Sequence, residues 1–375
     1  MSIKTLSKKM LAIVAAGAMT MGLAMPTSVF AAEGDTTNKV TEAYISKTFN
    51  TVVGKDETFS FKAEQVAGNT AEVTIPNISF SASETGSINR RAKVTFPEWP
   101  DAGKYEYTVT ETAAAPAITG EHQKMIMSQA EYTMDVYVSN GDSGLEIANI
   151  IVNKTKDDKG TSATGKVDIS DTDKNGFNFT NTYVQEAGTG TDPTNPDPTY
   201  TTDGSLNVTK KINANGGTLD TKKVFDFTAT FTFPKGTDAD TLGGVKDANG
   251  NKIQIGEDGT YKFTLTANGN MKFTGVPVGT QISVVESATP NYKGSAESVF
   301  NGQKQTPVEA SKYNTAFHVA NTLGQKQNKV DVTNTYDYVP TTGIIMNTLP
   351  YVLMIALCGA ALIAFVAFKR RRLQK

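Results

Sequence analysis

The chain has 375 residues, a length that predicts two or three domains. Its 36 basic and 38 acidic residues give a net charge of −2, so no basic field favours a nucleic-acid partner. Its single cysteine, Cys358, lies in an apolar run, and its histidines, His122 and His318, lack the spacing of metal ligands. These counts exclude disulfides, zinc fingers and cysteine nucleophiles, and we expect neither a metal nor a cofactor.

The first 31 residues have the pattern of a secretory signal peptide. Lysines near the start precede an apolar run over 10–25, and Val29-Phe30-Ala31 fits a cleavage box. An uncleaved membrane anchor is the alternative, but about 16 apolar residues are short for a bilayer span. We therefore assign 1–31 to a signal peptide and expect the mature chain to begin near Ala32.

Two halves of similar character follow, at 32–184 and 205–338. Each consists of short segments in which polar and apolar residues alternate, a period of two that is typical of strands. Between the halves, 185–204 is rich in Pro, Gly, Thr and Asp and is predicted to be a linker or a long connecting turn. Because no long 3.6-residue period occurs, both halves are predicted to be immunoglobulin-like β-sandwiches. The clearest strand candidates are 72–75, 104–110, 131–138, 225–233, 261–265 and 281–285.

Three strands in each half place a polar residue in the same phase as its apolar neighbours. Since alternate residues of a strand share one face, such a residue should point into the core. The first half has a lysine in its first strand, a glutamate in a middle strand and an asparagine in its closing strand, and the second half repeats this order. We call these sets the two triads: Lys47, Glu111 and Asn181, and then Lys210, Glu286 and Asn334.

A buried lysine beside a buried glutamate can react with a nearby asparagine. Burial lowers the pKa of a lysine and raises that of a glutamate, so the pair can exist as a neutral amine and a protonated acid. The amine can attack the asparagine amide while the acid shuttles protons, after which ammonia leaves and an isopeptide bond remains. Such a bond forms once per molecule, so we expect self-maturation and no enzyme activity toward an external substrate. The alternative is a buried salt bridge beside an asparagine that satisfies strand-end hydrogen bonds.

The C-terminal end combines a pentapeptide, an apolar run and a basic tail. The apolar residues at 344–368 are numerous enough to cross a bilayer, and the basic segment 369–375 predicts a cytoplasmic tail. This order resembles the cell wall sorting signal of Gram-positive surface proteins, with valine in place of the usual leucine. The resemblance implies that a sortase cuts between Thr342 and Gly343 and transfers the threonine to an amine; an extended juxtamembrane linker is the alternative. The motif residues are Val339, Pro340, Thr341, Thr342 and Gly343.

The strand motifs around the two triads, together with this signal, resemble the two-domain backbone pilins of Gram-positive bacteria, the streptococcal T-antigen type. The resemblance implies tandem CnaB-type immunoglobulin-like β-sandwiches, each closed by a Lys–Asn isopeptide bond that its glutamate assists. It also implies a secreted, cell-surface pilus subunit that is held transiently in the membrane and then polymerised through Thr342. The partners it implies are sortase, further copies of the chain, minor tip and base pilins, and peptidoglycan. Ala43 and Ile282 depart from the family's motifs, where a larger apolar residue and a tyrosine are usual.

A pilus also needs a lysine that accepts Thr342 of the next subunit. In T-antigen pilins this lysine lies seven residues before the isopeptide asparagine, which corresponds to Lys174 here. Lys174 stands in 171–176, a turn sequence in which an amine is readily exposed. The same segment imitates the start of a calcium loop, but its twelfth position is Thr182 instead of glutamate, so calcium is not expected. Competing acceptors nearby are Lys154, Lys156, Lys159 and Lys166.

Two other functions compete with that of a pilus shaft. A wall-anchored adhesin or a minor pilin could contain the same domains, and it would lack a lysine linked to Thr342 of another copy. An extracellular enzyme would need a cluster of acid, base or nucleophile outside the two triads, and the sequence indicates none.

Overall fold

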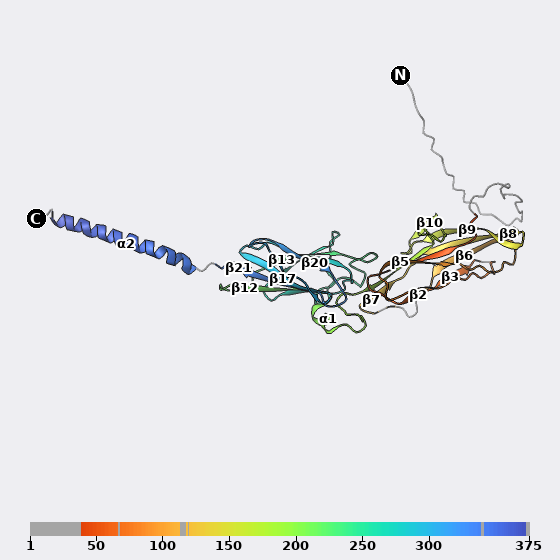
Figure 1. Cartoon of the computed structure of the whole chain (residues 1–375), viewed down its shortest axis with the longest axis horizontal. Coiled ribbons are helices and arrows are strands. Elements are labelled where there is room, and N and C mark those ends of the chain that lie inside the picture. The colour runs from red at the N-terminus through yellow and green to blue at the C-terminus, as the bar shows by residue number, and fades with distance from the viewer. Residues whose placement is uncertain (1–38, 67, 113–117, 119, 339–340, 373–375) are drawn as a thin grey trace, which may run out of the picture. The chain divides into compact units, whose positions relative to one another are not determined.

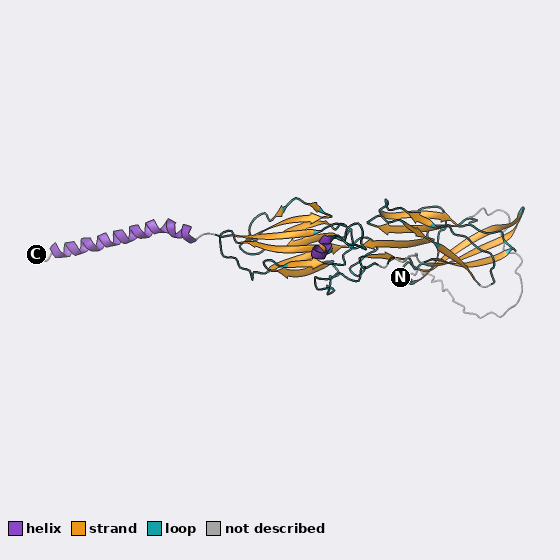
Figure 2. Cartoon of the chain, turned by 90° about the horizontal axis from the view of Figure 1, so that it is seen from below, coloured by secondary structure: helices purple, strands orange, loops and turns teal. Residues whose placement is uncertain are grey.

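The structure is a computed structural model, and strands dominate it (Figures 1 and 2). It describes residues 39–66, 68–112, 118, 120–338 and 341–372, with side chains in the last segment described for 351–366. The predicted signal peptide 1–31 and the motif residues Val339 and Pro340 lie outside the described residues. The all-β fold predicted from the sequence, two tandem immunoglobulin-like β-sandwiches, is confirmed.

The first sandwich consists of two sheets and a short pair of strands. Its strands are β1 (Tyr44–Thr51), β2 (Glu57–Phe59), β3 (Phe61–Gln65), β4 (Ile78–Phe80), β5 (Gly86–Lys93), β6 (Gly103–Glu111), β7 (Gln123–Ile126), β8 (Glu131–Gly141), β9 (Gly144–Lys156), β10 (Ser162–Lys166) and β11 (Asn178–Gln185). One sheet has the order β5-β1-β11-β7, the other has the order β10-β9-β8-β6-β3, and β2 pairs with β4. Large side chains from both sheets fill the core, among them Phe49, Tyr107, Tyr132 and Phe179.

The second sandwich has a related arrangement. Its strands are β12 (Leu206–Asn213), β13 (Phe225–Thr232), β14 (Thr260–Leu265), β15 (Asn270–Phe273), β16 (Gln281–Glu286), β17 (Tyr292–Phe300), β18 (Gln303–Lys304), β19 (Val308–Glu309), β20 (Phe317–Thr322) and β21 (Lys329–Tyr336). One sheet has the order β15-β12-β21-β17-β18, with β19 also paired to β17, and the other has the order β14-β13-β16-β20. Phe225, Phe227 and Phe273 are buried in its core.

In both sandwiches the first and last strands are parallel neighbours within one sheet. β1 pairs with β11 in parallel, and β12 pairs with β21 in parallel. The beginnings of the two strands in each pair therefore lie at the same end of their sandwich. This topology places residues that are more than 120 positions apart in the sequence on adjacent strands, as with Lys210 and Asn334, which are 124 positions apart.

The strand predictions are right for all but one segment. The segments 104–110, 131–138, 225–233, 261–265 and 281–285 correspond to β6, β8, β13, β14 and β16. The segment 72–75 is wrong, because it contributes only an isolated bridge between Thr74 and Thr95. Pro76 follows it directly and has no N–H to continue a ladder of hydrogen bonds, which explains why this alternating segment does not extend into a strand.

The connection at 185–204 is more ordered than its composition predicts. Residues 185–190 are all buried, and the N–H of Ala187 donates a hydrogen bond to the carbonyl oxygen of Val276 at 2.9 Å. The short helix α1 (Pro198–Asp203) follows Asp197, and its proline occupies the first turn, where the missing N–H costs no helical hydrogen bond. The connection is therefore packed against the second sandwich at its two ends, 185–190 and 203–204, while 191–202 are exposed or half-buried.

Glu186 holds this connection in place. Its side chain is 4% exposed and accepts hydrogen bonds from His122 Nδ1, the Tyr200 hydroxyl and the Ser205 hydroxyl, each at 2.7 Å, and from the N–H of Gly275. Burial would raise the pKa of Glu186, but these hydrogen bonds outweigh it and leave the pKa below its usual value. A carboxylate with so many donors is stable in its charged form despite burial.

The C-terminal helix α2 (Thr341–Arg372) contains the predicted apolar run. Within the described part of the chain, no helix is long and apolar enough to cross a membrane. The span predicted for 344–368 lies only partly among the side chains that the structure describes.

Candidate functional site

Lys47, Glu111 and Asn181 meet in the core of the first sandwich. Lys47 lies in β1 and pairs with Phe179 of β11, two residues before Asn181. Because alternate residues of a strand share a face, Lys47 and Asn181 point to the same side of their sheet. Glu111 is the last residue of β6, in the other sheet of the sandwich, so its carboxylate reaches them from across the core.

Glu111 joins the other two side chains. Lys47 Nζ donates a hydrogen bond to Glu111 Oε2 at 2.6 Å, and Asn181 Nδ2 donates one to Oε1 of the same carboxylate at 2.6 Å. The side-chain carbonyl oxygen of Asn181 accepts a hydrogen bond from the N–H of Ser128 at 2.7 Å. The Glu111 carboxylate thus holds a potential nucleophile, the Lys47 amine, close to the Asn181 amide, and it can itself serve as the acid–base group.

The surroundings of Lys47 disfavour its charged form. Lys47 and Asn181 are fully buried, and the centroid of the Phe59 ring lies 4.1 Å from Lys47 Nζ. Burial lowers the pKa of Lys47 to about 8, although the neighbouring Glu111 opposes this. Burial also raises the pKa of Glu111, against the opposing effect of Lys47. Both shifts reduce the free energy needed to move a proton from the amine to the carboxylate.

The second sandwich repeats the arrangement with Lys210, Glu286 and Asn334. Lys210 lies in β12 and pairs with Val332 of β21, again two residues before the asparagine. Glu286 is the last residue of β16, in the other sheet. Lys210 Nζ donates hydrogen bonds to Glu286 Oε2 at 2.9 Å and to Asn334 Oδ1, while Asn334 Nδ2 donates to Glu286 Oε1.

Aromatic rings also surround the amine in the second site. The ring centroids of Phe225 and Phe227 lie 3.9 and 5.7 Å from Lys210 Nζ. Burial lowers the pKa of Lys210 to about 8 and raises the pKa of Glu286. The two sites therefore share strand positions, register, a glutamate that bridges the lysine and the asparagine, and the directions of the pKa shifts; they differ in the donor to the asparagine Oδ1.

This arrangement is suited to exchange of the asparagine amide. Two charges buried away from water are costly, and transfer of one proton from lysine to glutamate leaves both groups neutral. The neutral amine is then a nucleophile beside an amide that is hydrogen-bonded to a proton donor. In the described chain, no cluster of three or more His, Cys, Asp or Glu side chains could hold a metal ion.

Sequence reasoning brought together the members of each triad but missed Ser128 and Asp158. Asp158 Oδ1 accepts hydrogen bonds from the Ser128 hydroxyl at 2.5 Å and from the N–H of Thr180 at 2.8 Å. Asp158 also raises the pKa values of Lys47 and Glu111, as one of the smaller effects on each. Both missed residues lie outside the strands, where no alternation marks a residue as inward.

Lys174, the predicted acceptor, is exposed in the turn that precedes β11. Asn175 anchors this turn, because its Nδ2 donates hydrogen bonds to the carbonyl oxygens of Tyr44 at 2.9 Å and Ser170 at 2.6 Å. The turn lies at the beginning of β11, whereas the end of β11 leads into the connection at 185–204. Lys174 is therefore at the end of the first sandwich that is remote from this connection.

The competing lysines differ in their surroundings. Lys156 forms an ion pair with Glu131 at 2.9 Å, and Lys154 Nζ lies 5.3 Å from the centroid of the Tyr132 ring. Lys156, Lys159 and Lys166 are exposed, as Lys174 is, whereas Lys154 is half-buried. Exposure by itself therefore leaves four candidate acceptors. Of the sortase motif, Thr341, Thr342 and Gly343 begin α2, and their side chains are outside the described part of the chain.

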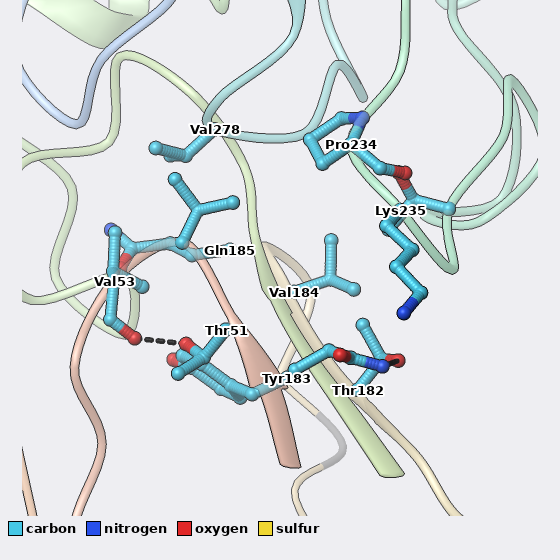
Figure 3. A pocket seen from close by; sticks show the side chains of 12 residues that line it. Thr51, Val53, Thr182, Tyr183, Val184, Gln185, Pro234, Lys235 and Val278 are labelled. Carbon is cyan, nitrogen blue, oxygen red and sulfur yellow. Dashed lines mark hydrogen bonds between the residues drawn. The ribbon is translucent and has the colours of Figure 1, made fainter. Parts of the chain in front are cut away.

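A small pocket lies away from both triads (Figure 3). Figure 3 shows Thr182, Tyr183, Pro234, Lys235 and Val278 around it. Among its described lining residues, Lys235 carries the only charge. This pocket therefore has no acid–base pair among its described lining residues.

Comparison with known protein families finds a match for each sandwich. Residues 43–184 match the family described as Spy0128-like isopeptide containing domain, and residues 204–336 match a domain of unknown function, DUF7601. No curated protein matches the chain. The match over residues 43–184 confirms the recognition of this domain type from its sequence motifs.

Several solved structures are similar to the chain. The major pilin protein (T3.2) from Streptococcus pyogenes serotype GAS13637 has 20% identity and a TM-score of 0.32, with 80% of this chain and 99% of that chain covered. The major pilin from Streptococcus pyogenes has 20% identity and a TM-score of 0.33, with 79% and 99% covered. An adhesin from Mobiluncus mulieris that contains disulfide, isopeptide and ester cross-links has 10% identity and a TM-score of 0.25, with 80% and 88% covered.

Proposed function

We propose that this chain, whose residues 43–184 match the family described as Spy0128-like isopeptide containing domain, is the backbone subunit of a sortase-assembled cell-surface pilus. Its role is structural, and its own chemistry is limited to self-maturation. The observation that carries the proposal is the repeated triad: a buried lysine and asparagine on adjacent parallel strands, bridged by a glutamate from the other sheet.

In the proposed maturation step, Lys47 Nζ attacks Asn181 Cγ, and Lys210 Nζ attacks Asn334 Cγ. The new Nζ–Cγ bond replaces the Cγ–Nδ2 bond. One proton passes from Nζ through the glutamate to Nδ2, which leaves as ammonia. The glutamate ends the reaction in its starting state, so Glu111 and Glu286 act as acid–base catalysts of a single turnover each.

Each bond would covalently join the first and last strands of its sandwich. The loops that the two bonds close span 134 positions, from Lys47 to Asn181, and 124 positions, from Lys210 to Asn334. By the chain-entropy argument used for disulfides, a loop of this length contributes about 4–5 kcal/mol of stability. Since 32–342 contains no cysteine, these bonds would supply the covalent cross-links that disulfides give to other exported domains.

The topology supports head-to-tail polymerisation through Thr342 and Lys174. Lys174 lies at the end of the first sandwich remote from the connection. β21 runs parallel to β12, which begins beside the connection, so β21 ends at the remote end of the second sandwich and leads toward Thr342. A subunit that donates at one end and accepts at the other forms an open filament instead of a closed ring.

Surface attachment is also part of the proposal. The signal peptide 1–31 would export the chain, and the apolar run at 344–368 would hold it transiently in the membrane until sortase cleaves after Thr342. Minor tip and base pilins and peptidoglycan would be its other covalent partners.

Coexpression of the full chain with a pilus sortase tests the polymerisation. We expect a ladder of covalent multimers that disappears in Lys174→Arg and persists in the matched control Lys166→Arg, an exposed lysine of the same sandwich. Tandem mass spectrometry should find Thr342 joined to Lys174. Attachment to the wall without any ladder would favour the wall-anchored adhesin or minor pilin instead.

A further inference from the structure

The first triad has a hydrogen-bond donor that the second triad lacks among its described contacts. This donor is the backbone N–H of Ser128. This N–H lies in the short segment between β7 and β8, is buried, and donates to Asn181 Oδ1 at 2.7 Å. We propose that the Ser128 N–H is the oxyanion donor of the first site and that Asp158 is the positioning residue that holds it there. This inference rests on the proposed isopeptide reaction and identifies two further participants in it.

The Ser128 N–H donates its hydrogen bond to Asn181 Oδ1, the atom that gains negative charge during the reaction. When Lys47 Nζ adds to Asn181 Cγ, the carbonyl oxygen Oδ1 becomes an oxyanion, and effective donors lie 2.7–3.1 Å from that oxygen, by the general geometry of such sites. The other end of the amide, Nδ2, donates to Glu111 Oε1 at 2.6 Å and leaves as ammonia after receiving the proton that Lys47 loses. The two amide atoms whose charge changes therefore have separate hydrogen-bonding partners: the Ser128 N–H for Oδ1 and the Glu111 carboxylate for Nδ2.

Asp158 fixes the donor relative to the reacting asparagine. Its Oδ1 accepts hydrogen bonds from the Ser128 hydroxyl at 2.5 Å and from the N–H of Thr180, the residue before Asn181, at 2.8 Å. The N–H of Gln129 also donates to the Asp158 backbone oxygen at 3.0 Å. One carboxylate oxygen thus joins the segment that carries the donor to the strand that carries the amide.

The second site provides an internal control. There Asn334 Oδ1 accepts a hydrogen bond from Lys210 Nζ, the attacking group itself, and Asn334 Nδ2 donates to Glu286. Replacement of Ser128 or Asp158 leaves these contacts unchanged. Both bonds form in the same molecule, so the second bond reports on expression, folding and the time allowed for reaction.

Replacement of Asp158 tests its positioning role. Residues 40–338 are expressed briefly and purified, and ammonia loss is followed by mass spectrometry, with peptide digests assigning each loss to a sandwich. We expect Asp158→Ala to slow the first bond by a factor of about 10 to 100, given that loss of an oxyanion donor costs about 10²–10³. Asp158→Asn retains an oxygen acceptor at Oδ1 and should react within a few-fold of wild type.

A pair of Ser128 variants tests the N–H itself. Ser128→Ala loses the hydroxyl but retains the N–H, whereas Ser128→Pro loses both, so the difference between them measures the N–H. We expect Ser128→Pro to form the first bond at least tenfold more slowly than Ser128→Ala. Near-ultraviolet circular dichroism confirms that the first sandwich is folded, and Glu111→Ala marks the rate without a catalytic acid.

Each outcome decides between the alternatives. Equal rates for Ser128→Pro and Ser128→Ala, or a wild-type rate for Asp158→Ala, would overturn the inference while leaving the proposed function intact. An Asp158→Asn variant as slow as Asp158→Ala, with a shifted pH profile, would show that Asp158 acts through its charge instead of its position. Absence of ammonia loss in the wild type would refute the proposed reaction itself.

Discussion

The two isopeptide bonds are predicted to contribute unequally to the tensile strength of the filament. If force enters a subunit at Lys174, it passes along β11 to the connection and then into β12, because Lys174 directly precedes β11. It next crosses from Lys210 to Asn334 and leaves through β21. The bond between Lys210 and Asn334 lies in this path, whereas the bond between Lys47 and Asn181 lies beside it.

The expected extensions follow from the lengths of the closed loops. Loss of the second bond by Glu286→Ala releases 124 residues, which at about 3.4 Å per residue gives an extension of about 420 Å. Loss of the first bond by Glu111→Ala releases the loop of 134 positions from Lys47 to Asn181, or about 460 Å, only when force enters before Lys47. With force entering at Lys174, Glu111→Ala should show no extension of this size.

Single-molecule force spectroscopy can separate these cases. Residues 40–338 contain no cysteine, so one handle can be attached at Lys174→Cys or at Val40→Cys and the other after Tyr338. Pulled from position 40, Glu111→Ala and Glu286→Ala should extend by about 460 and 420 Å, and the wild type by neither amount. A 460 Å extension of Glu111→Ala pulled from position 174, or a 420 Å extension of the wild type, would refute this reasoning.

Three further predictions concern the first sandwich and the connection. Phe59→Ala should slow the first bond and leave the second unchanged, because water that reaches Lys47 raises its pKa and reduces the neutral amine; mass spectrometry over time measures this, and an unchanged rate would contradict it. The hydrogen bond to Glu186 raises the pKa of His122, so its stabilisation is complete below about pH 6.5 and is lost as pH rises through the folded-state pKa. The difference in urea midpoint between wild type and His122→Ala should therefore shrink from about pH 5.5 to about pH 8.5, and a constant difference would count against it. Gly188 has a φ of +82°, and an added Cβ would lie 2.1 Å from the carbonyl oxygen of Gly204, so Gly188→Ala should destabilise the chain by about 1–3 kcal/mol in urea unfolding, unlike Gly68→Ala, where φ is also positive but the space is open.

The triads could be predicted because residues two positions apart in a strand point their side chains to the same face of the sheet. Lys47 alternates with Ile45 and Phe49, and Asn181 alternates with Phe177 and Phe179, so both had to point inward in any strand that buried those residues. Alternation does not determine which strands are neighbours. The repetition of the same order in both halves supplied that link, and the parallel pairing of the first and last strands explains it.

Other parts of the site had no such signal. Ser128 and Asp158 lie between strands, and their hydrogen bonds join segments that are 30 residues apart in the sequence. The composition of 185–204 indicated a linker or a long connecting turn and did not mark Glu186, which is buried among four hydrogen-bond donors. Around Ser128 and Asp158, and in the connection at 185–204, hydrogen bonds between segments distant in the sequence determine the structure. Local composition does not predict such bonds.

Covalent closure of both sandwiches is the central claim, and the intact mass of residues 40–338 tests it most directly. The wild type should be lighter than its sequence by two ammonias, Glu111→Ala and Glu286→Ala by one each, and the double variant by none. Digestion should yield branched peptides that join Lys47 to Asn181 and Lys210 to Asn334. A wild-type mass equal to that of the sequence would mean that the triads are buried ion pairs, and the account of a covalently stabilised pilus subunit would be wrong.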